Sequence, residues 1–182
     1  SGSVVKPSDE DLAAAAELIG KAKRPIFIIG HGAWDSRRQI ISLPEKRAAP
    51  VMTTFKGKGL IADSHPNAGG VLGRSGTPIA SWFMNEADLI IALGTSFSNH
   101  TGINPGKPII QVDFERMQLG KFHPVTLPIW GEIGAFCDAI DALECESSGV
   151  DQISELAQRW EMWREEKASR MAEETSSGIH SY

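Results

Sequence analysis

The sequence has very little cysteine, and what it has does not form a recognisable site. Only Cys137 and Cys145 occur, with no Cys-x-x-Cys pair, so a structural zinc centre is not expected. Both fall in or near one expected helix, about two turns apart, which is too far along its axis for a disulfide if both are helical. We therefore expect reduced cysteines and a cytoplasmic protein.

Positive charge and long apolar runs are also scarce. A net charge of −5 offers no basic surface for nucleic acid. No apolar run approaches the roughly 20 residues that span a bilayer, and the acidic N-terminal region lacks the hydrophobic stretch of a signal peptide. The 182 residues, 41% of them hydrophobic, suit one globular domain with a real core. We expect neither nucleic acid nor a membrane as a partner.

What the sequence does contain is a series of short apolar runs that end in glycine or small polar residues. The first, residues 25–29, lacks the alternation of a half-exposed strand and is typical of a strand buried on both faces. Similar runs follow at 50–54, 89–93, 108–113 and 125–130, with helical patterns at 8–22, 36–47, 78–86 and 132–143. This alternation predicts an α/β protein with a single Rossmann-like parallel sheet of five or six strands, helices on both faces and 25–29 at the centre.

The composition changes after about residue 145. Residues 1–145 are expected to form one domain, and 146–182 a linker and a polar C-terminal helix that leads to a domain the sequence does not contain. The helix, at 151–173, has a narrow apolar stripe of Ile153, Leu156, Trp160 and Trp163. Such a thin stripe predicts either incomplete packing on the domain or docking on a neighbouring molecule.

The end of the first strand is the main candidate for a ligand site, because open α/β sheets hold nucleotides at the carboxyl ends of their strands. Gly30 and Gly32 fit the first two glycines of a dinucleotide motif, but Asp35 replaces the third. The glycines either make room for a ligand or form a tight turn that packs closely. His31 between them either contacts a ligand or is simply carried by that turn.

Two further positions have the same two interpretations. Arg74 lies in a glycine-rich stretch, 55–76, that is expected to be a loop at a functional rim, where a guanidinium would suit a pyrophosphate. Asp113 ends a strand, where it would either bind a ribose or adenine group or cap the following turn. The sequence shows no nucleophile elbow, phosphate-loop motif or metal-ligand cluster, so no catalytic or metal residue is predicted.

Taken in order, several segments are similar to the central domain of thiamine-diphosphate-dependent enzymes, the acetolactate synthase and pyruvate oxidase group. They are 24–33, 49–59, 65–66, 70–77, 87–97, 110–113 and 131–132, within an unbroken resemblance over roughly 8–143. The resemblance implies a DHS-like NAD/FAD-binding fold. It also implies a parent enzyme whose other domains hold thiamine diphosphate and magnesium, and whose motifs for both are absent from this sequence.

In the flavin-containing relatives of that family, the central domain carries the ADP end of FAD. By motif match the nucleotide would contact Gly30, His31, Gly32, Thr53, Thr54, Phe55, Leu72, Gly73, Arg74, Gly94, Thr95, Phe97, Asp113 and Glu132. Three departures weaken the match: Ser96 replaces a frequent arginine, 98–100 replace Asp-Asp-Arg, and Glu132 replaces aspartate. The resemblance therefore implies at most weak binding of FAD or ADP.

The resemblance implies a detached, largely structural central domain, inactive alone, from an enzyme that decarboxylates, oxidises or joins 2-oxo acids. Its partners would be the flanking thiamine-binding domains, within a homo-oligomeric parent. Three alternatives stay open. The chain could be a stand-alone FAD- or ADP-binding module, or an assembly scaffold without a ligand. It could also be an enzyme of the sirtuin type, which the segment 94–97 resembles but which the shortage of zinc-binding cysteines disfavours.

Overall fold

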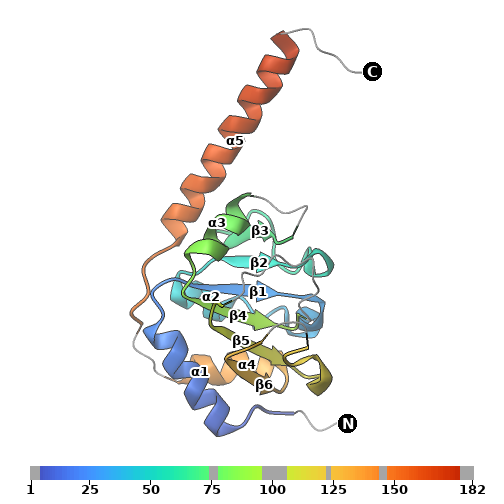
Figure 1. Ribbon diagram of the computed structural model, residues 1–182, viewed down its shortest axis with the longest axis vertical. Coiled ribbons are helices and arrows are strands. Elements are labelled where there is room, and N and C mark those ends of the chain that lie inside the picture. Colours follow the sequence, from blue (N-terminus) through green and yellow to red (C-terminus); the bar gives the residue numbers. More distant parts are fainter. Residues whose placement is uncertain (1–4, 74–77, 96–105, 122–123, 144–146, 177–182) are drawn as a thin grey trace.

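The fold is built on a six-stranded parallel sheet with the strand order β3-β2-β1-β4-β5-β6 (Figure 1). The computed structural model describes residues 5–73, 78–95, 106–121, 124–143 and 147–176. The strands are β1 (Pro25–Ile29), β2 (Val51–Thr53), β3 (Ala68–Val71), β4 (Leu89–Leu93), β5 (Ile109–Asp113) and β6 (Leu127–Trp130). β1 pairs with both β2 and β4, so the predicted α/β sheet with 25–29 in its interior is confirmed.

Helices cover both faces of the sheet. On one face lie α1 (Asp9–Lys21), α2 (Ser42–Arg47) and α4 (Ile133–Ala142), and on the other lie α3 (Pro78–Glu86) and the start of α5 (Ile153–Ser176). Alternate residues of β1 serve the two cores, with Phe27 and Ile29 on the first face and Ile26 and Ile28 on the second. This two-sided burial explains why the strand contains no polar residue.

The first helix begins and ends as its sequence pattern predicts. The Ser8 hydroxyl oxygen accepts a hydrogen bond of 3.1 Å from the backbone N–H of Asp11, which satisfies one of the unpaired donors of the first turn. Three acidic residues lie in that first turn, at the positive end of the helix dipole, and Lys21 lies in the last turn, at its negative end. Both placements stabilise the helix.

Two elements differ from the expectation. The supposed loop at 55–76 contains β3, whose sequence Ala-Gly-Gly-Val has too little strand propensity to be recognised. It forms because it pairs with β2 at the sheet edge. Of the helix expected at 36–47, only the last part is helical, as α2. The reason is that a proline is tolerated in the first turn of a helix but not in its interior. Pro44 therefore places the helix start at Ser42, and a 3₁₀ helix, η1 (His31–Ser36), occupies part of the segment before it.

The buried cysteine is chemically quiet. Cys137 lies fully buried on α4, and burial raises the pKa of its thiol to about 12. The thiolate that would react or bind a metal is therefore suppressed at neutral pH. Cys145 lies outside the described residues.

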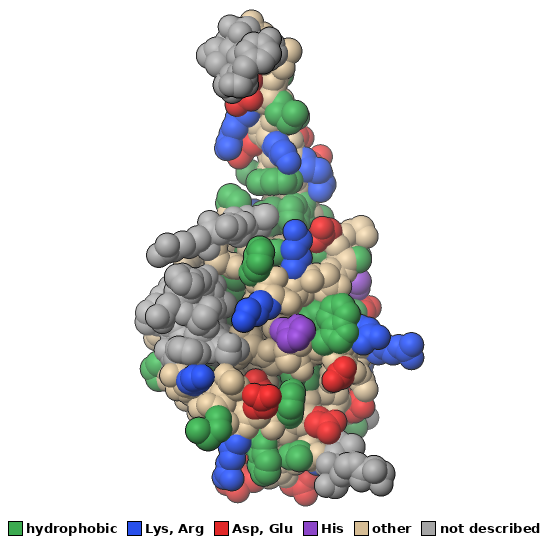
Figure 2. Space-filling model, turned by 90° about the vertical axis from the view of Figure 1, so that its right-hand side faces the viewer, with side chains coloured by type: hydrophobic (Ala, Val, Ile, Leu, Met, Phe, Trp, Pro, Cys, Tyr) green, Lys and Arg blue, Asp and Glu red, His purple; other side chains and the backbone are tan. Residues whose placement is uncertain are grey.

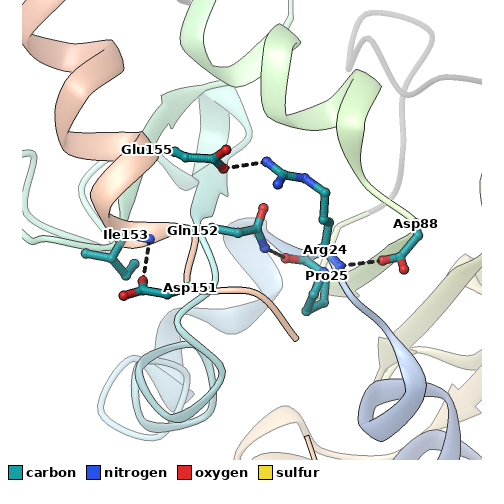
Figure 3. Close-up of polar contacts among 7 residues, drawn as sticks. All are labelled: Arg24, Pro25, Asp88, Asp151, Gln152, Ile153 and Glu155. Atoms are coloured by element: carbon teal, nitrogen blue, oxygen red, sulfur yellow. Dashed lines mark hydrogen bonds and ion pairs between the residues drawn. The ribbon is translucent and has the colours of Figure 1, made fainter. Parts of the chain in front are cut away.

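The start of α5 is tied to the amino end of β1 by polar contacts (Figure 3). The Gln152 side chain is fully buried and donates a hydrogen bond of 2.8 Å to the carbonyl oxygen of Pro25. The Arg24 Nη2 lies 2.6 Å from the Glu155 Oε2, and the backbone N–H of Arg24 donates to the Asp88 carboxylate. These contacts fix where the helix leaves the domain.

The apolar stripe of α5 has its partner inside this chain. Leu156 is 0% exposed in the core shared with α3, and Trp160 Nε1 donates to the Ala68 carbonyl oxygen at 2.8 Å. Beyond Trp163 every described residue of the helix is exposed, and the helix extends away from the sheet (Figure 1). The position of the domain boundary stays a prediction. Within the described residues, no helix combines the length and apolar character needed to cross a bilayer.

Candidate functional site at the carboxyl edge of the sheet

The predicted site residues that the structure describes all lie along the carboxyl edge of the sheet. The strand order places them in a row: Leu72 and Gly73 after β3, Thr53 to Phe55 at β2, Gly30 to Gly32 after β1, Gly94 and Thr95 after β4, Asp113 at β5 and Glu132 after β6. Arg74 and Phe97 lie outside the described residues. The chain order reverses between β1 and β4, which is where such sheets hold ligands.

At this switch point the glycines pack backbone against backbone. A Cβ added to Gly30 would lie 2.5 Å from the carbonyl oxygen of Gly94 and 2.8 Å from the Cα of Thr95. A Cβ added to Gly94, whose φ is +67°, would collide with the backbone of Gly32 and Ala33. The close approach of two strand ends is therefore sufficient to explain these glycines.

Three backbone N–H groups at the switch point are already used. Gly30 donates to the Leu93 carbonyl, Gly32 to the Gly94 carbonyl and Ala33 to the Gly30 carbonyl, each at 3.0 Å. A phosphate site at a strand–helix junction depends on N–H groups that point at the ligand. These three are engaged in the fold, so they do not form such a cradle.

The residues at the end of β2 are a buried threonine, a threonine that caps the next turn and an exposed aromatic ring. Thr53 is 4% exposed, and Thr54 Oγ1 accepts from the backbone N–H of Gly57 at 3.2 Å. Phe55, which begins the 3₁₀ helix η2 (Phe55–Gly57), is 75% exposed, and His31 after β1 is exposed as well. Phe55 and His31 are thus accessible at the edge, whereas Thr53 is buried and Thr54 caps the turn that follows it.

Asp113 caps the turn that follows its strand. Its Oδ1 accepts a hydrogen bond of 2.9 Å from the backbone N–H of Glu115, and the residue is 5% exposed. Burial raises the pKa of the carboxyl above its ordinary value, and the bond from Glu115 opposes that rise. This geometry is that of the structural alternative for Asp113, with one carboxylate oxygen engaged.

Gln111 was not among the predicted site residues, although it organises this part of the edge. The side chain is 0% exposed, and its Nε2 donates to the Thr95 carbonyl at 3.1 Å and to the Gln118 carbonyl at 3.0 Å. Its Oε1 accepts from the Gly120 N–H at 2.8 Å. A lone amide within an apolar strand is the signal that would have found it, because a buried polar group needs partners.

The remaining residues of the row are buried or face solvent. Leu72 packs in the core at 5% exposure, and Glu132 is exposed before α4, where its side chain caps no N–H group. Within the described parts of the chain, no three His, Cys, Asp or Glu side chains could hold a metal ion. The described residues therefore do not fit a magnesium site, and the N–H groups of Gly30, Gly32 and Ala33 do not form a phosphate cradle.

The doubly wound parallel sheet and its switch point define a Rossmann-like α/β domain. The chain belongs to the family of thiamine pyrophosphate enzyme central domains, whose family model matches residues 12–140. Acetolactate synthase large subunits and thiamine pyrophosphate-containing proteins are among its homologues.

Three relatives illustrate this membership. The chain is 34% identical over 157 residues to YdaP of Bacillus subtilis, described as a thiamine pyrophosphate-containing protein, with 86% of this chain and 25% of YdaP covered. It is 34% identical over 172 residues to the 3D-(3,5/4)-trihydroxycyclohexane-1,2-dione hydrolase of Lacticaseibacillus casei, covering 90% and 26%. It is 31% identical over 131 residues to the acetolactate synthase isozyme 1 large subunit of Escherichia coli, with 69% of this chain and 23% of that subunit covered. The chain thus spans about a quarter of the length of these relatives.

Proposed function

We propose that this chain is the largely structural central domain of a thiamine-diphosphate-dependent enzyme that acts on 2-oxo acids, and that it is inactive alone. The observation that carries the structural role is the switch point, where Gly30, Gly32 and Gly94 pack against one another and their N–H groups are engaged. A central domain of this kind holds the catalytic domains in position, and a homo-oligomer of the full-length protein would complete the enzyme.

The proposed chemistry requires parts that this sequence does not contain. When bound, thiamine diphosphate supplies the stabilised carbanion, and a protein must hold its two ends. The diphosphate and magnesium motif expected from the family resemblance is absent from the sequence. The contribution of this chain's own residues is to orient the neighbouring domains.

The isolated chain is expected to release no carbon dioxide from pyruvate when thiamine diphosphate and magnesium are added. The reason is that its described residues contain no cluster that could hold a metal ion, and the diphosphate and magnesium motif expected from the family resemblance is absent from the sequence. Coupled detection of carbon dioxide over hours would measure this, with a full-length acetolactate synthase as positive control. Turnover by the purified chain that disappears when thiamine diphosphate is removed would refute the proposal.

FAD and ADP are expected to bind weakly at best, and the purified chain to be colourless. The N–H groups of Gly30, Gly32 and Ala33 are not free for a diphosphate. Each missing charge-assisted hydrogen bond lowers affinity by about ten- to a hundredfold, since it contributes roughly 1.5–3 kcal/mol. Flavin fluorescence during titration, with ADP as competitor, measures this. A yellow protein on purification, or saturation at micromolar flavin, would contradict the structural role. No change in flavin fluorescence at millimolar ADP would agree with a ligand-free scaffold.

A further inference from the structure

The carboxyl edge has a second feature, a group of exposed hydrophobic side chains at its β5–β6 end. Phe114 is 49% exposed, Met117 85% and Trp130 43%. Figure 2 faces this edge and shows hydrophobic side chains reaching its surface between charged ones. Scattered surface hydrophobics need no explanation, but here Trp130 is hydrogen-bonded to Phe114, and Met117 directly follows Arg116, whose guanidinium lies over the Trp130 ring. We call Phe114, Arg116, Met117 and Trp130 the corner cluster.

The corner cluster is held in a defined arrangement. Trp130 Nε1 donates to the Phe114 carbonyl oxygen at 2.9 Å, and the Arg116 guanidinium lies 5.2 Å from the centre of the Trp130 ring. The Asp113 cap described above fixes the turn that carries Phe114. Trp, Met, Phe and Arg are the residues enriched at protein interfaces, where preorganised side chains lose little entropy on binding.

The positive charge of Arg116 is available to pair with a carboxylate of a partner. Within the described part of the chain it forms no ion pair, and its only described charged contact is with the Trp130 ring. A carboxylate on a docked surface would pair with the Arg116 guanidinium. An apolar recess on the same surface would accept the Met117 and Trp130 side chains. Apolar side chains that become buried on docking, together with one charge-assisted contact, are typical of a specific interface.

The chain enters the domain beside this cluster. The N–H of Glu132 donates to the Val5 carbonyl at 2.8 Å, and a Cβ added to Gly131 would lie 2.7 Å from the Pro7 ring. Because Gly131 follows Trp130 directly, Val5, the first described residue of the chain, lies next to the cluster. The C-terminal helix leaves the domain far from this corner (Figure 1).

We propose that the corner cluster is the docking surface for the domain that precedes this one in the full-length protein. The inference rests on the proposed function and on relatives of which this chain covers only about a quarter. The occupant presents an apolar recess and a carboxylate. Its attachment next to Trp130 makes docking intramolecular, so a modest interface suffices at the resulting effective concentration.

Methionine oxidation tests the proposal. Peroxide is applied to the isolated chain and to the full-length protein, and the sulfoxide at each methionine is followed by mass spectrometry. We expect Met117 to oxidise about tenfold more slowly in the full-length protein, because a docked domain covers its thioether. Met171, 60% exposed on α5, serves as the reference position. Equal rates at Met117 in the two proteins would overturn the proposal. Protection that grows with protein concentration would also overturn it, in favour of a second copy as the occupant.

A matched pair of variants gives a second measurement. In the full-length protein, Met117→Glu is expected to speed protease cleavage before Val5 by about 30-fold, the effect of losing an interface anchor. Met171→Glu adds the same charge at another exposed methionine and should change that rate by less than about twofold. Equal rates for the two variants would contradict the docking surface.

The docking surface and the proposed function fail in distinguishable ways. A full-length protein that binds thiamine diphosphate but leaves Met117 open to peroxide refutes the docking surface alone. A full-length protein that protects Met117 but does not bind thiamine diphosphate refutes the proposed function alone.

Discussion

Gly94→Ala is expected to lower the free energy of unfolding by about 3–5 kcal/mol, which would unfold much of a marginally stable domain. Two effects add. The residue has a φ of +67°, a conformation that is strained for any side chain, and its added Cβ would collide with the backbone of Gly32 and Ala33. Backbone atoms at the centre of a sheet cannot move aside as a flexible side chain can. Urea unfolding followed by circular dichroism measures the change.

Gly120→Ala is the matched control for this prediction. Gly120 has nearly the same φ, +68°, but an added Cβ meets nothing within 4 Å. It should therefore cost only the conformational strain, about 1–2 kcal/mol. The difference between the two variants isolates the contact at the switch point. If the two lose equal stability, close packing is not the reason for Gly94, and the ligand-binding interpretation of the glycines regains support.

Leu156→Ala is expected to lower the free energy of unfolding by about 2–5 kcal/mol, as for other fully buried leucines. Leu156 is 0% exposed in the core that α5 shares with α3 and β1, and truncation would leave a cavity there. Met171→Ala, at 60% exposure on the same helix, should change stability by less than about 0.5 kcal/mol. Both variants are measured by urea unfolding of the isolated chain.

The outcome also bears on where the domain ends. The change in composition after about residue 145 predicts a boundary there, whereas a large loss for Leu156→Ala would extend the folded unit into α5. No loss at Leu156 would mean that the helix does not dock stably on the isolated chain. Hydrogen bonds from Gln152 and Trp160 to the sheet favour the first result.

Most of the sheet could be predicted because its strands are locally distinctive. The runs at 25–29 and 89–93 are apolar throughout, and the structure buries all ten of their residues. β3 could not be predicted, because Gly69 and Gly70 have no side chain to signal a strand. It exists through its pairing with β2 and the bond from Trp160, contacts between segments far apart in the sequence.

That the described candidate residues share one edge of the sheet was predictable, but the contacts they make there were not. Glycine and small polar residues at strand ends indicate the carboxyl edge, because parallel strands place all such ends on one side. Whether Gly30 makes room for a ligand or for Gly94 depends on how closely two strand ends approach. That distance is set by the pairing of the strands, and it cannot be predicted from the sequence around Gly30 or from that around Gly94.

Residues 8–143 were enough to indicate the family, the parallel sheet and its central strand, since each depends on apolar runs and motifs that are continuous in the sequence. The role of Asp113 as a turn cap and that of Gln111 as the link between two loops required the folded structure. So did the packing of Leu156 and Trp160 on the sheet. The physical reason is that a hydrogen bond or a buried contact belongs to two groups, and here the partners of Gln111, Leu156 and Trp160 are brought within reach only when the sheet has formed.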